Sequence, residues 1–443
     1  MTRPTVYIET YGCQMNVSDS ELMLGALAAR GYESVNVPDG ADVILVNTCA
    51  IRDHAEQRVI GRLGELRRHM KADTIMGVTG CMAQRLGPQI LDRAKHVSLV
   101  IGPDGYRALP ALLDGAREGR RVSVTDFDLE EHYEDFTPRR FDRVKAWIPV
   151  QRGCDYRCTY CIVPTTRGSE RSRQLADVVR ETCGVVAEGM SEVVLLGQTV
   201  NSYNDGTHDF ADLLRAVGAV PGVKRIRFTS PHPNDFSERV IHAMAETRAM
   251  CEHVHLPMQS GSSRTLRRML RRYTREEFLA CVARLRTAIP GLALTTDVIV
   301  GFPGETDEDF AETLSAVSEV GFDDAFTFKF SPRDGTPATR FPPSETVPDA
   351  VASSRLDRLV DTVRSATRAR NLQLLGTRHE VLIEKEARRG DLLQGRTRDY
   401  KTILIPGDAS MIGTYLHVEI TGTTGFTFTG AIVPERVPLP MAG

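Results

Sequence analysis

Apolar runs and amphipathic stretches alternate along the first 120 residues. Three short runs, TVYIET, VILVN and TIMGV, are strand-like, and each precedes a longer stretch in which apolar residues recur at helical spacing. The helical stretches cover residues 18–31, 51–70 and 82–94. Ser18 and Ser20, followed by Glu21, predict the start of the first helix. The alternation predicts an α/β domain at residues 1–120, with helices on the faces of a parallel sheet.

A second alternating series follows a charged, non-periodic stretch at 121–145, which we interpret as a linker. Six strand-like runs separated by amphipathic helices predict a parallel barrel, or part of one, within residues 146–374. The runs lie at 147–151, 192–197, 225–230, 253–257, 293–301 and 325–331, and a helical pattern follows from residue 344. Residues 375–437 contain short strands rich in Gly and Thr, which predict a small antiparallel β-barrel.

Composition narrows the function classes. A chain of 443 residues favours two or three domains, and 41% apolar with 26% charged residues excludes disorder on a large scale. The net charge of −3 gives no global argument for nucleic acid, so any RNA contact must come from local basic patches. No apolar run reaches the length of a membrane span, and the start MTRPTVYIETYGCQMN lacks the apolar segment of a signal peptide. We therefore expect a cytoplasmic protein, in which nine cysteines indicate metal ligands or reactive thiols.

Three cysteines stand within eight residues in the segment CDYRCTYC, which follows the strand-like WIPVQ. Cys154, Cys158 and Cys161 are therefore expected at the carboxyl end of a strand, where barrel enzymes carry their chemistry. Three thiolates can hold three irons of a [4Fe–4S] cluster and leave the fourth iron open. The alternative is a structural zinc site, but the nearest following histidine, His208, lies outside ordinary ligand spacing.

A second set of cysteines is dispersed in the sequence. Cys13, Cys49 and Cys81 each follow one of the three N-terminal strands, in YGC, NTC and TGC. Because the carboxyl ends of parallel strands meet at one edge of a sheet, these thiols should converge. A second three-cysteine cluster is favoured over the alternative of three buried apolar thiols. The remaining cysteines lie in or beside apolar patterns and are predicted to be core residues: Cys183, Cys251 and Cys281.

The C-x3-C-x2-C spacing, with an aromatic residue before the last cysteine, resembles the radical S-adenosylmethionine family. This resemblance implies that S-adenosylmethionine chelates the open iron and yields a deoxyadenosyl radical. It also implies cofactor contacts at the strand ends, from Tyr160, Gln198, Gln259, Ser260 and Gly301. For Gln198 and Gln259 a turn or helix-capping role is the alternative. The segment GFPGE departs by one residue from the spacing of the family, so the resemblance assigns no contact to Glu305.

Several further segments resemble the methylthiotransferases over nearly the whole chain. They are YGCQMN, VNTCAIR, GCMAQ, CTYCIVPTTRG, LLGQTVNSY, LPMQSGS, VIVGFPGET and KFSPRDGTPA. The resemblance implies two [4Fe–4S] clusters, an auxiliary one on Cys13, Cys49 and Cys81, and a radical-generating one on Cys154, Cys158 and Cys161. One S-adenosylmethionine would methylate a sulfur on the auxiliary cluster, and a second would yield the radical.

The substrate and partners also follow from the resemblance. The triplet Gln14-Met15-Asn16 is similar to the branch that modifies C2 of prenylated adenosine beside the anticodon of tRNA. The implied partners are tRNA, S-adenosylmethionine, an electron donor protein of the flavodoxin or ferredoxin type, and a sulfur source. Three alternatives are kept: a methylthiotransferase for threonylcarbamoyl-adenosine tRNA, one for a ribosomal protein, and a non-catalytic iron–sulfur RNA-binding redox sensor.

Two local basic segments are candidates for RNA contact. Arg271 and Arg272 belong to SSRTLRRMLRRYTR, whose arginines recur at helical spacing and form either a phosphate-binding stripe or a solvated face. The C-terminal barrel resembles the TRAM domain, an OB-like RNA-binding module. Its segment GRTRDYKT surrounds Tyr400 with charges, and the predicted contacts are Arg396, Arg398 and Lys401.

Overall fold

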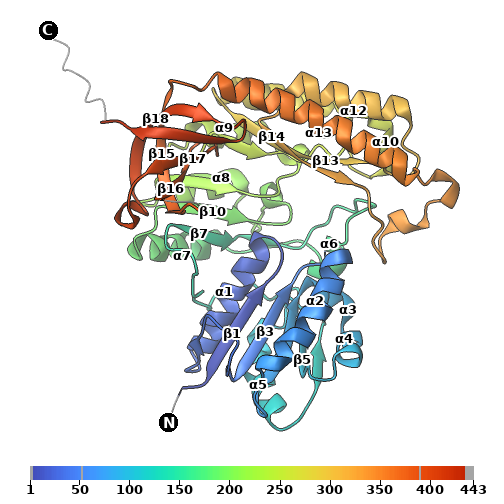
Figure 1. The fold of residues 1–443 in the computed structure, drawn as a ribbon, viewed down its shortest axis with the longest axis vertical. Coiled ribbons are helices and arrows are strands. Elements are labelled where there is room, and N and C mark those ends of the chain that lie inside the picture. Colours follow the sequence, from blue (N-terminus) through green and yellow to red (C-terminus); the bar gives the residue numbers. More distant parts are fainter. Residues whose placement is uncertain (1–2, 51–52, 389–390, 435–443) are drawn as a thin grey trace.

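The computed structural model describes residues 3–50, 53–388 and 391–434. The N-terminal domain contains a parallel sheet in the order β2-β1-β3-β4-β5-β6 (Figure 1). Its strands are β1 (Thr5–Thr10), β2 (Glu33–Ser34), β3 (Val43–Thr48), β4 (Ile75–Gly80), β5 (Leu99–Ile101) and β6 (Val122–Val124). Strands β3 and β4 are buried along their whole length, as continuous apolar runs in a parallel sheet require.

Helices cover both faces of this sheet. One face packs against α1 (Gln14–Ala28) and α5 (Leu109–Arg117). The other packs against α2 (Asp53–Leu66), α3 (Cys81–Leu86) and α4 (Pro88–Arg93). The predicted α/β domain is thus confirmed, with β6 extending it past residue 120 into the predicted linker.

The central domain is an open barrel of six parallel strands. They form two sheets, β7 (Lys145–Pro149), β10 (Glu192–Leu196) and β11 (Arg225–Phe228), and then β12 (His253–His255), β13 (Ala293–Val300) and β14 (Asp324–Lys329). A parallel bridge between Ile226 and Met250 joins the two sheets. The outer face of the barrel packs against α7 (Leu175–Ala187), α8 (Phe210–Gly218), α9 (Glu238–Glu246), α11 (Arg275–Ala288), α12 (Asp307–Val320) and α13 (Asp349–Leu372). The shorter elements are β8 (Gln151–Arg152), β9 (Arg171–Ser172), α6 (Val163–Arg167) and α10 (Ser263–Arg268).

The C-terminal domain is a closed five-stranded barrel. Its strands are β15 (Arg378–Glu386), β16 (Leu392–Thr397), β17 (Thr402–Pro406), β18 (Tyr415–Thr423) and β19 (Thr427–Ile432). They close in the order β15-β16-β17-β19-β18, and inward-facing Val, Ile, Leu and Phe side chains fill the interior. The prediction of an antiparallel barrel is correct except for one pair, because β17 and β19 run parallel. Residues 435–437 of the predicted domain lie outside the described residues.

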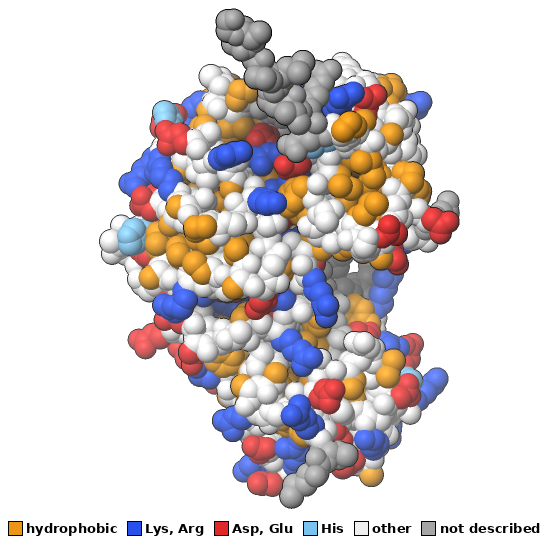
Figure 2. All heavy atoms as spheres, turned by 90° about the vertical axis from the view of Figure 1, so that its left-hand side faces the viewer, with side chains coloured by type: hydrophobic (Ala, Val, Ile, Leu, Met, Phe, Trp, Pro, Cys, Tyr) orange, Lys and Arg blue, Asp and Glu red, His pale blue; other side chains and the backbone are white. Residues whose placement is uncertain are grey.

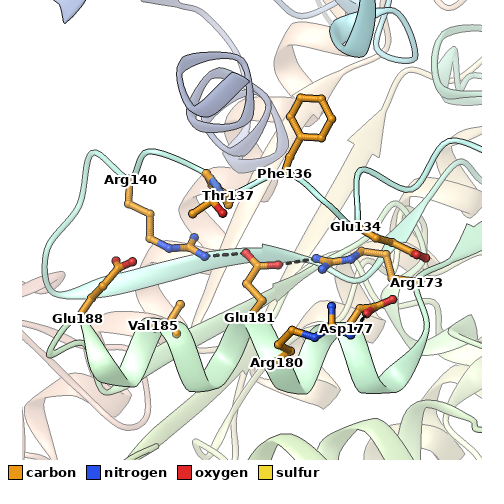
Figure 3. A pocket seen from close by; sticks show the side chains of 12 residues that line it. Glu134, Phe136, Thr137, Arg140, Arg173, Asp177, Arg180, Glu181, Val185 and Glu188 are labelled. Carbon is orange, nitrogen blue, oxygen red and sulfur yellow. Dashed lines mark hydrogen bonds and ion pairs between the residues drawn. The ribbon is translucent and has the colours of Figure 1, made fainter. Parts of the chain in front are cut away.

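The N-terminal domain lies at one end of the molecule, and the surface is hollowed between it and the other two domains (Figure 2). The linker between the N-terminal and central domains is anchored to α7. Figure 3 shows the Glu181 carboxylate lying between two guanidinium groups, with Arg140 Nη2 2.6 Å from one oxygen and Arg173 Nη1 2.5 Å from the other. The linker is therefore tied to the central domain by a largely buried ion-pair network.

Two local predictions were wrong. Helix α1 begins at Gln14 with Cys13 as its N-cap, so Ser18 and Ser20 are buried residues inside the helix and do not start it. The stretch 82–94 is two helices, because Gly87, with φ of +49°, and Pro88 interrupt it. The first two residues of the predicted helix at 51–70 lie outside the described residues. Within the described ranges, none of the helices combines the length and apolar character that a membrane crossing needs.

Candidate active site

The N-terminal cysteine site, consisting of Cys13, Cys49 and Cys81, lies at the carboxyl edge of the first sheet. Strands β1, β3 and β4 are parallel neighbours, so their carboxyl ends meet there. A hydrogen bond with Cys49 lowers the pKa of the Cys13 thiol to about 6. A Cβ atom added to Gly12, whose φ is +142°, would lie 2.8 Å from Cys49 Cβ, so glycine allows the two strand ends to approach. Of the three thiols predicted to converge, Cys13 and Cys49 are in contact in this structure.

Two buried asparagines fix the backbone around these thiols. Asn16 Nδ2 donates to Asn47 Oδ1 and to the Thr48 carbonyl, both at 3.2 Å. Asn47 Nδ2 donates in turn to the Asn16 carbonyl at 2.8 Å. The Asn16 side-chain oxygen accepts from the Cys13 backbone N–H at 3.3 Å. These amides hold the start of α1 against the end of β3, so the motifs YGCQMN and VNTC are two halves of one network.

The central cysteine site, consisting of Cys154, Cys158 and Cys161, lies in the loop between β8 and α6. A hydrogen bond of 3.1 Å joins Cys154 Sγ to Thr199 Oγ1 beyond the end of β10. Burial raises the pKa of Cys154, and it raises the pKa of Cys161 to about 12. The neutral thiol forms of Cys154 and Cys161 are thus favoured, and a metal centre must displace their protons to bind.

A buried arginine supplies positive charge to this loop. Arg271 is 6% exposed, and its Nη1 lies 3.6 Å from Cys158 Sγ. Its other donors bind the Tyr273 hydroxyl at 3.0 Å and the Pro257 carbonyl at 3.1 Å. Among the described residues no carboxylate lies within hydrogen-bond distance of it. A buried guanidinium whose nearest anion source is a thiol fits a thiolate-bound cluster, and this assigns Arg271 to the cysteine site, not to an exposed RNA-binding stripe.

The two cysteine sites face each other. Ile162, next in sequence to Cys161, packs in one apolar cluster with Cys81 and Ala50 of the N-terminal domain. Helix α6 follows directly, and Arg167 at its end donates from Nε to Cys81 Sγ at 3.1 Å. Five residues thus separate the last cysteine of the central site from an arginine that contacts the other site.

Arg167 also ties the N-terminal site to a buried carboxylate. Its Nη2 donates to Asp19 Oδ2 at 2.6 Å, and its side chain is 3% exposed. Its Nη1 is buried and has no hydrogen-bond partner among the described residues. A buried donor without a partner is costly, and the thiolates and sulfides of a cluster beside Cys81 are acceptors that would satisfy it. The residues at the N-terminal site therefore fit an iron–sulfur group.

A single metal ion fits neither site. In the described part of the chain, no three His, Cys, Asp or Glu side chains converge closely enough to hold one ion. A cluster spreads its ligands over separate irons, so its thiols need not meet at one point.

The predicted cofactor contacts lie around the strand ends of the barrel. Gln198 Oε1 accepts from the Gly153 N–H at 2.5 Å and thereby shapes the central cysteine loop. Gln259 is buried with φ of +66°, and the Ser260 hydroxyl lies 3.2 Å from Thr313 Oγ1. Tyr160 packs beside Met269 and Phe302 at the mouth of the barrel. For Gln198 the turn role considered above is present, and cofactor contact by these residues stays a prediction.

The segment after β13 is braced against α13. Gly301 has φ of +72°, and a Cβ added there would lie 2.7 Å from Ala352 Cβ. The Glu305 carboxylate accepts from the Gly301 N–H at 3.0 Å and pairs with Arg355 Nη1 at 2.7 Å. Glu305 is thus buried and held by the Gly301 N–H and by Arg355.

The basic segment of the C-terminal barrel forms a joint between domains. Arg398 Nε pairs with Glu252 at 2.8 Å, and Lys401 Nζ pairs with Asp323 at 2.8 Å. The Arg396 guanidinium lies 4.1 Å from the centre of the Tyr400 ring and 3.3 Å from Glu384. All three cations are paired with carboxylates in this structure, and their contact with RNA stays a prediction.

The arginine-rich segment of the central domain is not one helical stripe. Helix α10 ends at Arg268, and Leu270 and Arg272 have φ of +56°. Arg268 is paired with Glu345, whereas Arg272 is exposed, with its guanidinium 5.9 Å from the centre of the Tyr156 ring. Arg272 therefore remains the predicted phosphate contact of this segment.

The three cysteines outside the two sites differ in burial, and one of them was predicted wrongly. Cys251 and Cys281 are buried, as expected, but Cys183 is exposed. Four further residues of the two sites were not predicted from the sequence: Arg167, Asp19, Asn47 and Thr199. Polar residues inside otherwise apolar patterns, such as Asn47 at the end of VILVN, were the available signal.

Comparisons with known proteins cover the three domains in turn. Residues 5–102 match the family described as Uncharacterized protein family UPF0004, residues 148–317 the Radical SAM superfamily, and residues 373–433 the TRAM domain. The chain is 44% identical over 444 residues to the tRNA-2-methylthio-N(6)-dimethylallyladenosine synthase of Geobacillus kaustophilus, covering 97% of this chain and 82% of that protein. It is 43% identical over 425 residues to the protein of the same name from Solibacter usitatus, covering 94% and 95%.

Solved structures support the fold over about three quarters or more of the chain. The radical S-adenosylmethionine methyltransferase TsrM from Kitasatospora setae, with cobalamin and a [4Fe-4S] cluster bound, superposes with a TM-score of 0.58 at 16% identity, covering 76% of this chain and 77% of that one. The cobalamin-dependent S-adenosylmethionine radical enzyme OxsB gives a TM-score of 0.55 at 13% identity, covering 82% and 56%. At this identity the likeness concerns the fold alone.

Proposed function

This chain belongs to the tRNA-2-methylthio-N6-dimethylallyladenosine synthase family of radical S-adenosylmethionine enzymes, and on that premise we propose how its two cysteine sites divide the reaction. The chain is a methylthiotransferase that adds a methylthio group to C2 of N6-dimethylallyladenosine at position 37 of tRNA. It works with [4Fe–4S] clusters and S-adenosylmethionine.

The central cysteine site is proposed to hold the radical-generating cluster, and the N-terminal cysteine site the auxiliary one. When bound, the first supplies the electron that cleaves S-adenosylmethionine, and the second keeps a sulfur ready for transfer. The chain itself fixes the ligands: Gln198 holds the backbone of the central loop, and Asn16 holds that of Cys13. Arg271 and Arg167 each bring a buried positive charge to one thiol.

One observation carries this division of labour. Cys81 of the N-terminal site packs against Ile162, the neighbour in sequence of Cys161 in the central site. A radical formed at one site can act only on groups held nearby, so a sulfur held at the facing site is suitably placed for transfer. C2 of adenine is a poor target for a thiolate nucleophile, which accounts for the need for a radical.

Further participants complete the proposal. S-adenosylmethionine is proposed to contact Tyr160, Gln198, Gln259, Ser260 and Gly301 at the strand ends. Arg272 is proposed to contact tRNA phosphate. An electron donor protein of the flavodoxin or ferredoxin type and a sulfur source are proposed as partners, and the cytoplasm as the location, because the thiols must stay reduced.

Mass analysis of tRNA nucleosides from cells lacking this protein tests the function. We expect loss of the 2-methylthio group with the prenyl group retained, and recovery of the 2-methylthio group when the wild-type chain is restored. Expression of the Cys49→Ala variant in the deletion strain should not restore the 2-methylthio nucleoside. Normal levels of 2-methylthio nucleoside in the deletion strain would contradict the proposed function.

A further inference from the structure

The inner face of the central barrel is distinguished from the outer face by the alternation of side chains along each strand. Val298 and Val300 of β13 lie in the apolar core that includes residues of the outer helices, and so does Leu294. Asp297 and Ile299 alternate with them along the strand and therefore point to the opposite, inner face.

Neighbouring domains cover the inner face over the first half of the barrel. Met15 of α1 packs against Leu196 of β10. At β11 and β12 the Tyr400 ring of the C-terminal barrel lies 4.9 Å from the Arg227 guanidinium and stacks on His253 at 4.6 Å. The N-terminal and C-terminal domains thus fill the inner side of β7, β10 and β11.

The inner face over β12 to β14 carries a different kind of surface, the inner-face patch, consisting of His255, Asp297 and Phe326. Phe326 is paired with Asp297 across the sheet and is 60% exposed. Its ring lies edge-on to His255, with centres 5.8 Å apart. His255 Nε2 lies 3.3 Å from Asp297 Oδ2, and the two side chains are 21% and 26% exposed. An exposed aromatic ring therefore stands beside an oriented carboxylate.

The patch is continuous with the central cysteine site. Ile299 is the next inner-face residue of β13 toward the carboxyl end of the strand. It packs against the apolar cluster to which Tyr160, the neighbour of Cys161, also belongs. Parallel strands share one carboxyl edge, so the patch lies on the inner face toward the edge that carries the cysteine loop.

We propose that the inner-face patch binds the base of the target nucleotide and recognises its N6-alkyl group. An N6-alkylated adenine keeps one N6–H, which the Asp297 carboxylate can accept, and its alkyl chain is matched by the exposed Phe326 ring. His255 orients the carboxylate, and Thr295 Oγ1 orients His255 through a 2.9 Å hydrogen bond to Nδ1. Phe326 is then the residue that selects prenylated over unmodified adenosine. This inference rests on the proposed function and specifies its substrate site.

Binding of two matched RNAs to the reconstituted holoenzyme tests the proposal. The probes are an anticodon stem–loop RNA with N6-dimethylallyladenosine and the same RNA with adenosine at that position. Phe326→Ala should weaken binding of the prenylated RNA by roughly tenfold or more, by the scale of base–aromatic contacts, and leave the unmodified RNA within about twofold. Phe326→Leu should restore most of the loss because it keeps an apolar contact. Phe141→Ala, at a phenylalanine that is 53% exposed in the linker, is the matched control.

The outcomes separate the inference from the function beneath it. Product formation by wild type on the prenylated RNA, with a loss in Phe326→Ala specific to that RNA, supports both. If wild type forms product, but Phe326→Ala binds each RNA as tightly as wild type does, this inference alone is overturned. An equal loss for both RNAs, or a loss of S-adenosylmethionine affinity instead, also overturns it. If wild type forms no methylthio product, the proposed function fails and the inference with it.

Discussion

The two cysteine sites solve one chemical problem with opposite chain designs. The central site draws three thiols from eight consecutive residues of one loop, whereas the N-terminal site draws one thiol from each of three βα units. The loop needs side-chain support from outside, which Gln198 and Thr199 provide. The dispersed site inherits its geometry from the sheet, because parallel register already aligns the strand ends.

The sites also share a feature that follows from their burial. Each has one buried arginine against one thiol, Arg271 at Cys158 and Arg167 at Cys81. A thiolate cluster is anionic, and in a low-dielectric interior a nearby guanidinium offsets the cost of burying it. Arg167 comes from the central domain but serves the N-terminal site, so the second site is complete only when the domains are docked.

Removal of the central thiols should have the largest effect. Replacing Cys154, Cys158 and Cys161 together with Ala should lower the iron of anaerobically reconstituted protein from about eight to about four per chain and abolish cleavage of S-adenosylmethionine. Iron and sulfide analysis with a deoxyadenosine assay measures both. Full iron content in this variant would refute the assignment of the central site.

A single substitution in the dispersed site should separate the two sites. Cys49→Ala should leave deoxyadenosine production near the wild-type rate but abolish the methylthio product, because the radical site is intact while the sulfur-holding site is not. Cys183→Ala, at an exposed cysteine outside both sites, is the control. Normal product from Cys49→Ala would mean that the N-terminal thiols are structural.

Loss of the Arg167 guanidinium should change the midpoint potential of the cluster at the N-terminal site. In the background that lacks the central thiols, Arg167→Gln should shift the midpoint potential of the remaining cluster negative, on the order of tens of millivolts, because a donor and a positive charge are lost. Redox titration followed by electron paramagnetic resonance measures the shift. Arg171→Gln is the matched control, since Arg171 crosses the same domain interface to Asp104 without contacting a cysteine. An equal shift in both variants would indicate an effect of domain docking alone.

The smallest expected effect concerns the contact between α1 and the linker. Glu21 of α1 accepts from the Phe141 N–H of the linker at 2.9 Å, and burial raises the pKa of Glu21 from 4.5 to about 7. The folded chain therefore binds more protons than the unfolded chain between these values, and stability falls as the pH rises from about 4.5 to 7. Glu21→Gln does not titrate, so its stability relative to wild type should rise over that range, on the order of 1–3 kcal/mol.

Thermal unfolding at several pH values between 5 and 8 measures this difference. Glu188→Gln, at an exposed carboxylate near the same linker contact, is the control. A difference between Glu21→Gln and wild type that does not change with pH would contradict the assigned burial effect.

Local patterns predicted the elements well where burial and chain direction are regular. Three N-terminal strands, β1, β3 and β4, and the six barrel strands lie where alternation and apolar runs indicated, whereas β2, β5 and β6 were not predicted. The signal is clearest for β3, β4 and β10, because a strand buried on both faces must be apolar along most of its length. The start of α1 was missed because Cys13 acts as its N-cap, and a cysteine is not among the usual capping residues.

Charged residues were the least predictable. Arg398 and Lys401 look like RNA ligands beside Tyr400, yet their partners, Glu252 and Asp323, lie about 80 or more residues away in another domain. Arg271 and Arg272 are adjacent in one arginine-rich segment, yet Arg271 is buried against Cys158 whereas Arg272 is exposed. Sequence spacing reports which side chains are near one another along the chain, whereas pairing across domains depends on docking.

The sequence by itself determined the three domains and the two sets of cysteines, because these depend on local periodicity and on the position of each cysteine relative to a strand. Only the tertiary structure decided that the two sites face each other through Ile162 and Arg167, and that the basic segment of the C-terminal barrel is a domain joint. The physical reason is that burial and charge pairing are properties of surfaces brought together from distant segments, and no local pattern encodes which surfaces will meet.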